Sequence, residues 1–255
     1  MRWSRIIRCV YKKKTLTSVD GDNDRLSIID YISPVPFCSI RCLEDVSGGW
    51  YSAIYLAKIR KQQPFLRLTQ KLIKIWASIS FPKNILILGC AGCSIPRFLS
   101  HQFPDVNVVG VEKSNQLINI AKQYFFARQY KNFHLFHSDA FIWVNEFVIA
   151  KRVPLFNCIF VDLFNGAHIV EDALSSSFLE SLYCIMEDDS LALFNIHKTA
   201  HFRTLMNSAD SFQYRCAIVS NKRCVVALLK SSTTVIIQRF RKSISRWKIT
   251  YEKYA

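Results

Sequence analysis

Three acidic residues stand at the ends of three predicted β-strands that succeed one another along the chain: Glu112, Asp139 and Asp162. In an open α/β sheet, ligands bind outside the carboxyl ends of the strands, so the three carboxylates are predicted to face one site. Three carboxylates suit a nucleoside that carries a cationic sulfonium. Glu112 would hold its ribose, Asp139 its adenine amino group, and Asp162 its positive end or the incoming nucleophile. Taken singly, each acid could instead be a helix N-cap or a solvated loop charge.

A turn of small residues precedes the first of these acids. Gly89, Ala91 and Gly92 follow the apolar run of residues 85–88, so the backbone can turn sharply there and lie against a ligand. Glu112 lies 20 residues after Gly92, about the separation at which an acid accepts hydrogen bonds from ribose hydroxyls. No Gly-Lys-Ser/Thr follows the turn, which argues against a phosphate loop. The pattern predicts a nucleoside site.

Strands and helices alternate around these residues. The hydrophobic spacing predicts helices over residues 64–80, 114–129, 141–150, 171–186 and 199–209. It predicts strands over residues 85–88, 106–111, 133–137, 158–161, 190–195, 212–219 and 222–230. The last two strands meet at Ser220-Asn221, a tight hairpin turn. The expected fold is therefore α/β: a doubly wound, seven-stranded, mostly parallel sheet with an antiparallel C-terminal hairpin, the class I methyltransferase-like Rossmann architecture.

The predicted organisation has four parts. These are a basic and polar lead-in (residues 1–34), a small N-terminal hairpin and helix (35–80), the nucleoside-binding domain (81–230) and a basic C-terminal tail (231–255). The net charge of +15 is concentrated at the ends, since residues 1–14 contribute +6 and residues 231–255 contribute +5. Such cationic ends could touch a polyanion, namely nucleic acid or anionic lipid, or could simply be solvated.

Nine cysteines, an odd number, lie mostly within apolar runs, where cysteine acts as a small hydrophobe. That usage fits a reducing compartment, so the expected location is the cytoplasm. The pairs Cys38/Cys42 and Cys90/Cys93 leave a zinc site or a redox dithiol open, and His197 and His201 could bind a metal or be solvated; the prediction is that no metal is needed. No apolar run is long enough to span a bilayer, and the first residues lack the pattern of a secretory signal.

Three stretches carry a family resemblance: LILGCAGCSIPRFLSHQFPDVNVVGVE, HSDAFIWV and FNCIFVDLF. Over about residues 65–230 the chain resembles the spermidine synthase (polyamine aminopropyltransferase) family, especially its shorter, methyltransferase-like members. The resemblance implies that Gly89, Ala91 and Gly92 line an adenosyl donor. It implies that Glu112 binds the ribose, that Asp139 and Ala140 bind the base, and that Asp162 accepts a proton from the attacking amine. The donor would be S-adenosylmethionine or its decarboxylated form, and the acceptor a small amine.

The chain also departs from that family. Gly92 stands where the family usually has an aspartate that grips the amine of the donor, and Asn165, a candidate substrate-binding residue, replaces a second aspartate. Phe178-Leu179 replaces a Phe-Tyr pair, so the tyrosine that contacts the amine substrate is missing. The family's N-terminal β-domain is expected only as a remnant within residues 35–60. These departures weaken the case for polyamine recognition more than the case for the donor.

Three functions follow from these observations. The first is transfer of an aminopropyl group from decarboxylated S-adenosylmethionine to a polyamine such as putrescine, which the family resemblance favours. The second is methyl transfer from S-adenosylmethionine to an unknown acceptor, which Gly92 favours because the donor then keeps its carboxylate. The third is a catalytically reduced adenosine-binding protein. A homodimer is left open.

Overall fold

The central feature of the chain is an eight-stranded sheet with the strand order β14-β12-β13-β11-β8-β5-β6-β7. The computed structural model describes residues 11–20, 25–166, 168–196, 199–220, 223–245 and 247–254. The strands of the large sheet are β5 (Asn84–Leu88), β6 (Asn107–Glu112), β7 (Phe133–His137), β8 (Phe156–Val161), β11 (Met186–Ile196), β12 (Tyr214–Ser220), β13 (Arg223–Lys230) and β14 (Lys248–Tyr254). The run from β11 through β8, β5 and β6 to β7 is parallel, while β12, β13 and β14 pair antiparallel. The predicted fold class is confirmed, with one additional strand.

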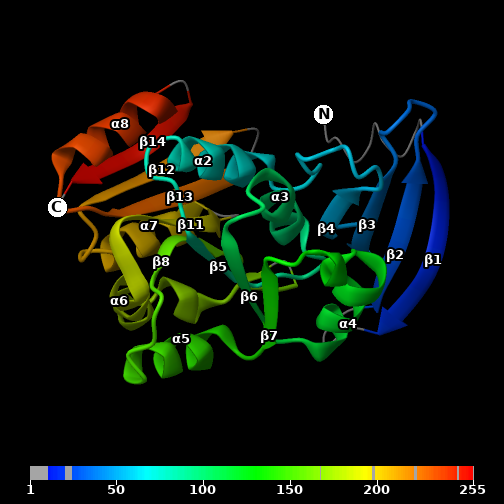
Figure 1. Ribbon diagram of the computed structural model, residues 1–255, viewed down its shortest axis with the longest axis horizontal. Helices are drawn as coiled ribbons and strands as arrows, with labels where there is room; N and C mark the ends of the chain where they lie inside the picture. The colour runs from blue at the N-terminus through cyan, green and yellow to red at the C-terminus, as the bar shows by residue number, and fades with distance from the viewer. Residues whose placement is uncertain are drawn as a thin grey trace.

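Helices cover both faces of this sheet (Figure 1). They are α2 (Arg67–Ala77), α3 (Ser94–Gln102), α4 (Asn115–Tyr124), α5 (Ala140–Ile149), α6 (Ser176–Ile185), α7 (Thr199–Ser208) and α8 (Thr234–Ile244), with short 3₁₀ turns η1 (Ala127–Gln129) and η2 (Glu171–Leu174). Side chains of α2, α3 and α8 share one apolar core, and those of α5, α6 and α7 share the other. Ile85 and Ile87 of β5 face the first core, while Leu86 and Leu88 face the second. A central strand buried on both faces explains why β5 is apolar throughout.

A second sheet is formed by the N-terminal part of the chain, at the right of Figure 1. It is an antiparallel meander of β1 (Lys12–Asp20), β2 (Arg25–Ile32), β3 (Ile40–Asp45) and β4 (Trp50–Tyr55). One of its faces packs on α4, where Ile28, Leu43 and Ile54 meet Ile120 and Phe125. The four-stranded sheet therefore rests on the helical layer of the large sheet rather than standing apart from it.

This sheet corrects two expectations. Residues 12–20 and 25–32 are strands rather than part of a poorly packed basic and polar lead-in, and the N-terminal β-structure is a four-stranded sheet rather than a remnant within residues 35–60. The charges of Lys12, Lys13 and Lys14 obscured the strand pattern of β1 in the sequence. These lysines lie on an edge strand, where they discourage pairing with another chain. The apolar residues of β2, of which Ile28, Ile29 and Tyr31 are buried, were the signal that the sequence did offer.

The C-terminal segment is also folded rather than a free tail. Ile237, Phe240 and Ile244 form the buried stripe of α8, at the spacing of an amphipathic helix. β14 then pairs antiparallel with β12. The positive charge of this segment obscured that periodicity, although basic residues on the outer face of a packed helix are ordinary.

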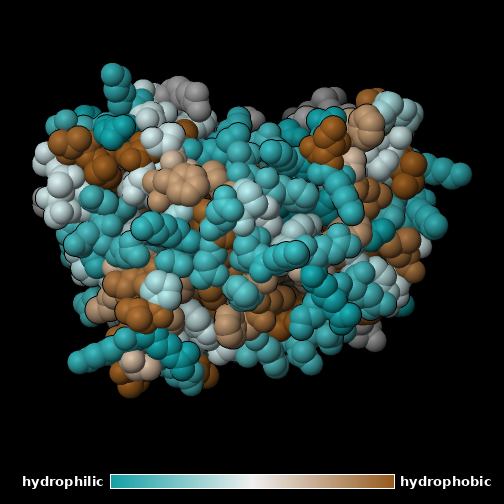
Figure 2. All heavy atoms as spheres, viewed as in Figure 1, coloured by the Kyte–Doolittle hydropathy of each residue, from teal (hydrophilic) through white to brown (hydrophobic). Residues whose placement is uncertain are grey.

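Two further findings concern the hydropathy of the helices and of the surface. Among the described helices, none is both long enough and apolar enough to cross a membrane. Hydrophilic residues cover most of the face shown in Figure 2, and hydrophobic ones appear there as separate patches.

Candidate active site

The turn after β5 is shaped by the close passage of β8. Gly89 has a φ of 86°, and a side chain there would clash with the main-chain oxygen of Asp162. Its amide donates to the carbonyl of Val111 at 2.9 Å. Glycine is required at this position for two separate reasons, the left-handed backbone and the lack of space.

Glu112 braces this turn from the end of β6. One of its carboxylate oxygens accepts the amides of Cys90 at 3.0 Å and Ala91 at 2.9 Å, and the other accepts the amide of Ser114 at 3.0 Å. The residue is only 8% exposed. A carboxylate offers about four acceptor positions, so these three bonds leave capacity for one more donor, such as a hydroxyl group.

Asp139 lies beyond the end of β7, with Ala140 buried as the first residue of α5. Its carboxylate caps α5 by accepting the amide of Phe141 at 2.9 Å and pairs with the ammonium of Lys113 at 3.0 Å. Partial burial alone would raise the pKa of Asp139, but the bonds from Lys113 and Phe141 outweigh it and lower that pKa. The N-cap interpretation of this acid is therefore correct, and it does not by itself exclude contact with a ligand.

Asp162 follows β8, on the other side of the turn from Glu112. The side-chain amide of Asn195 donates to its carboxylate at 2.8 Å. Because Phe194 of β11 lies opposite Val161 of β8 in the parallel register, Asn195 comes beside Asp162. Sequence reasoning missed Asn195, although a polar residue near the end of an otherwise apolar strand was a usable signal.

Asn165 lies a few residues further on, in a minimal hairpin of β9 (Phe164–Asn165) and β10 (His168–Ile169). It is exposed. Leu179 of α6, in contrast, is buried in the apolar core that α5, α6 and α7 share, together with Phe178 of the same helix. A side chain at position 179 thus serves packing in this chain.

The strand order places these groups in a row along one edge of the sheet: Asp162, the Gly89 turn, Glu112 and Asp139. Burial raises the pKa of the Cys90 thiol, and the neighbouring thiol of Cys93 and the carboxylates of Glu112 and Asp162 raise it further. Cys90 therefore lies within electrostatic reach of both Glu112 and Asp162. Asp139 pairs with Lys113, the residue that follows Glu112.

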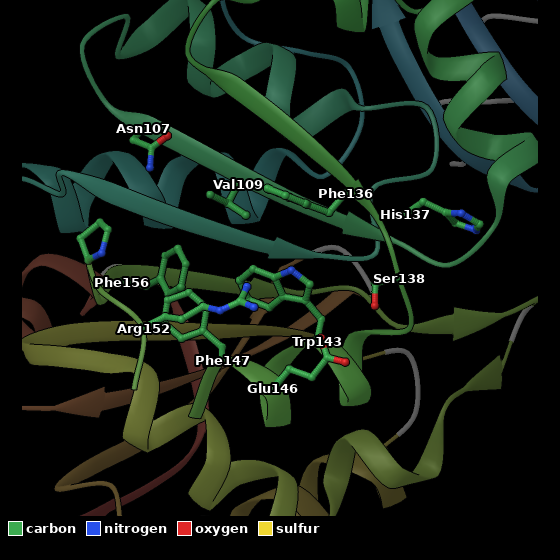
Figure 3. A pocket seen from close by; sticks show the side chains of 11 residues that line it. Asn107, Val109, Phe136, His137, Ser138, Trp143, Glu146, Phe147, Arg152 and Phe156 are labelled. Carbon is green, nitrogen blue, oxygen red and sulfur yellow. The ribbon is translucent and has the colours of Figure 1, made fainter. Parts of the chain in front are cut away.

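A groove of about 370 Å³ lies next to this row, between α5 and the strands β6 and β7 (Figure 3). Its wall includes the aromatic side chains of Trp143, Phe147 and Phe156. It reaches His137 and Ser138, just before Asp139, but Glu112 and Asp162 do not line it. The sequence did not predict this groove, which runs under α5 rather than over the small-residue turn.

Gly92 faces the N-terminal sheet. A Cβ atom at Gly92 would lie 2.6 Å from the Cβ of Ser52 in β4 and 3.2 Å from the ring of Phe125. The hydroxyls of Ser52 and Ser94 are 2.5 Å apart, and the Ser94 hydroxyl also contacts the main chain of Ala53 at 2.9 and 3.0 Å. The N-terminal sheet is thus fixed to the start of α3, and position 92 has no space for a side chain.

Gly92→Ala is expected to lower the free energy of unfolding by about 1–3 kcal/mol, because the methyl group overlaps Ser52. Chemical denaturation measures the loss. The double variant with Ser52→Gly removes the overlapping atom and should recover part of it, after correction for Ser52→Gly alone. Equal losses for Gly92→Ala in both backgrounds would show that the Ser52 contact is not the cause.

The thiols of Cys90 and Cys93 are both buried, and burial is the main reason why the pKa of each is raised. A raised pKa keeps a thiol protonated at pH 8, and the protonated form is a poor nucleophile. We therefore expect iodoacetamide to label the exposed Cys184 well before either of them in the folded protein. Mass spectrometry of timed digests measures the order. Early labelling of Cys90 or Cys93 would reopen the redox-dithiol alternative.

No group of three or more metal-ligating side chains occurs within the part of the chain that the structure describes. His197, one of the two histidines considered as ligands, lies outside the described residues.

The parallel sheet, the glycine turn after β5 and the acids after β6 and β8 define a class I methyltransferase-like fold. A family model described as "Putative methyltransferase" matches residues 83–162, which contain the turn and all three acids.

Comparison with individual proteins gives one relative with a similar sequence. A polyamine aminopropyltransferase from Vibrio vulnificus is 23% identical over 158 residues, which are 59% of this chain and 52% of the relative. The chain thus matches about half the length of that protein. This segment of the chain is therefore similar in sequence to a polyamine aminopropyltransferase.

Solved structures show the same fold. A probable spermidine synthase from Corynebacterium glutamicum has a TM-score of 0.67 at 16% identity, covering 94% of this chain and 97% of that one. Spermidine synthase from Thermotoga maritima has a TM-score of 0.63 at 14% identity, covering 95% and 81%. Human methyltransferase-like protein 13, solved with SAH, has a TM-score of 0.59 at 14% identity, covering 70% and 90%. The synthases match nearly the whole chain, in agreement with its N-terminal sheet.

Proposed function

We propose that this protein is a transferase that binds an adenosyl sulfonium donor at the Gly89 turn and transfers an aminopropyl group to a polyamine such as putrescine. The observation that carries the proposal is the pair of carboxylates on either side of that turn. Glu112 is bonded to the turn itself, and Asp162 is held by Asn195. The resemblance to a polyamine aminopropyltransferase supports the choice of group transferred.

In this proposal each residue has a distinct role. The main chain from Gly89 to Gly92 lies along the donor, and Glu112 accepts a ribose hydroxyl at its remaining acceptor position. Asp139 and Ala140 contact the base at the end of β7. Asn165 lies on the acceptor side, in the exposed hairpin after β8.

Asp162 would act as general base. An amine is protonated at pH 7, so it must lose a proton before its nitrogen can attack. Asp162 takes that proton, the nitrogen forms a bond to the carbon next to the sulfonium, and the carbon–sulfur bond breaks. The electron pair of that bond neutralises the sulfur, and methylthioadenosine leaves. Asn195 fixes the carboxylate that receives the proton.

Methyl transfer is the second candidate. Position 92 cannot hold a carboxylate, because Ser52 occupies the space that a side chain would need. A donor that keeps its own carboxylate does not need an acid there to neutralise its amine. A non-catalytic adenosine-binding protein is the third candidate.

The free state of the described cysteines supports the further proposal of a reducing compartment, the cytoplasm.

Titration calorimetry with S-adenosylmethionine, its decarboxylated form and methylthioadenosine tests the proposal. Aminopropyl transfer predicts tighter binding of the decarboxylated donor, and mass analysis with putrescine should find a product enlarged by one aminopropyl group. Preference for S-adenosylmethionine would favour methyl transfer, and binding without any product would favour the third candidate. Failure of all three ligands to bind would exclude the proposed donor site.

A further inference from the structure

Arg97 is a buried cation that forms no ion pair with any residue that the structure describes. It lies in α3, only 1% exposed, and its Nε and Nη1 atoms have no hydrogen-bond partner within the described part of the chain. A guanidinium stays charged in proteins, and a buried charge without a partner costs several kcal/mol. Such a group is unusual in a folded protein unless a group beyond the described residues completes it.

The neighbours of Arg97 provide packing but little compensating charge. Its guanidinium lies 5.1 Å from the ring centroid of Phe126, which also has Arg41 at 5.8 Å. Arg41 is paired through two bonds, at 2.7 and 2.8 Å, with Asp30. Tyr130 hydrogen-bonds to Arg97, but burial raises the pKa of Tyr130 to about 12, so its hydroxyl is neutral at pH 7. Among the described residues, Arg97 therefore has no carboxylate partner such as the one that Arg41 has in Asp30.

Further positive groups lie close by. The ring of His101, one turn later in α3, is 5.6 Å from the ring of Tyr130. Burial lowers the pKa of His101, and the charges of Arg97, Lys61 and Lys58 lower it further. These two lysines belong to residues 56–66, a segment without helix or strand between β4 and α2. We name Arg97, His101, Lys58 and Lys61 the basic corner.

Hydrogen bonds of Gln63 and Gln70 fix the backbone of the segment that carries the two lysines. The side-chain amide of Gln63 donates to the carbonyls of Arg60 at 2.9 Å and Lys61 at 3.1 Å, and its oxygen accepts the amide of Tyr55 at 3.1 Å. Gln70 of α2 accepts the amide of Gln63 at 2.9 Å. The basic corner is therefore built on fixed backbone rather than on a free loop, as a binding site requires.

We propose that the basic corner binds an oxyanion of the phosphate or carboxylate type, with Arg97 as its anchor. The unpartnered Nε and Nη1 atoms of Arg97 point to different sides of the guanidinium, so each offers a separate charged donor to one oxygen of an anion. Because both unpartnered atoms are covered, the ion must displace a neighbouring side chain as it enters. The proposal does not depend on the transferase function. It rests on the charge of Arg97 in α3 and not on the small-residue turn after β5.

Thermal unfolding in sodium phosphate, compared with sodium chloride at matched ionic strength and pH, tests the proposal. A ligand that binds only the folded state raises Tm in a saturable way, here by roughly 5 °C at about 100 times Kd. Arg97→Met should abolish that rise without lowering Tm in chloride, because it replaces an unpaired buried charge by an apolar chain. Arg128→Gln removes an exposed positive charge from η1 and should keep the rise.

Two results would overturn the proposal: no saturable rise in the unaltered chain, or an equal rise in Arg97→Met. If Arg97→Met does not fold, Arg97→Lys keeps the charge but loses the separate Nε and Nη1 donors, and binding at least about 10-fold weaker is expected. Calorimetry with phosphate and with acetate distinguishes the two oxyanions. Nuclear magnetic resonance of His101 provides a local readout, since a bound anion should raise the pKa of His101 in the unaltered chain and not in Arg97→Met.

Discussion

Asp162→Asn is expected to reduce turnover by about 10²–10⁴-fold while the affinity for the donor changes little. The amide keeps the size of the carboxylate and can still contact Asn195, but it cannot take a proton from the acceptor amine. Single-turnover kinetics with mass detection measure the product, and calorimetry measures the donor affinity. The loss should fall on kcat, because the interaction concerns the reacting amine rather than the resting donor.

Two variants serve as controls for Asp162. Asp172→Asn removes an equal charge from the exposed start of η2 and should leave kcat unchanged. Asn195→Ala leaves the carboxylate in place but frees it, so a smaller loss, about 10-fold, is expected if Asn195 positions it. Undiminished turnover in Asp162→Asn would exclude this residue as the base.

Glu112→Ala is expected to lower the free energy of unfolding by about 3–5 kcal/mol, because three main-chain amides lose their acceptor and each unpaired buried group costs about 1–3 kcal/mol. Donor affinity should fall by at least about 10-fold, since the turn that lies along the donor is no longer fixed. Chemical denaturation and calorimetry measure the two effects. Retention of both stability and affinity would show that Glu112 neither supports the turn nor contacts the donor.

Glu112→Gln separates these two contributions. The amide group keeps one acceptor oxygen but directs N–H groups toward either Ser114 or the Cys90–Ala91 amides, so an intermediate loss of stability is expected. Lys113→Ala is the matched control. It changes the next residue, which is largely exposed, and removes only the partner of Asp139. A surface ion pair contributes at most about 1 kcal/mol.

The central strands of the large sheet could be predicted from the sequence because strands such as β5 and β8 are buried along their whole length. Gly89 and Glu112 were identifiable for the same reason: the position after a buried strand determines where a residue lies, whatever its neighbours in space. The same reasoning located Asp162 at a strand end. Whether these groups hold a donor stays a prediction.

Contacts between distant segments could not be predicted in this way. Asn195 reaches Asp162 only through the register of two strands that are far apart in the chain. Ser52 limits position 92 from another sheet altogether. The strands β1 and β2 and the final α8 and β14 were missed because their charges outweighed their apolar residues in the interpretation. Burial of one face is sufficient for such elements, and the charged face carries little information about it.

The apolar contact between the N-terminal sheet and α4 has a consequence for unfolding. Ile28, Leu43 and Ile54 cannot leave Ile120 and Phe125 without exposing both partners to water. The serine pair joins the same two bodies a short distance away. The N-terminal sheet (β1–β4) and the rest of the described structure should therefore unfold as one cooperative unit, and removal of that sheet would expose part of the interior of the larger body.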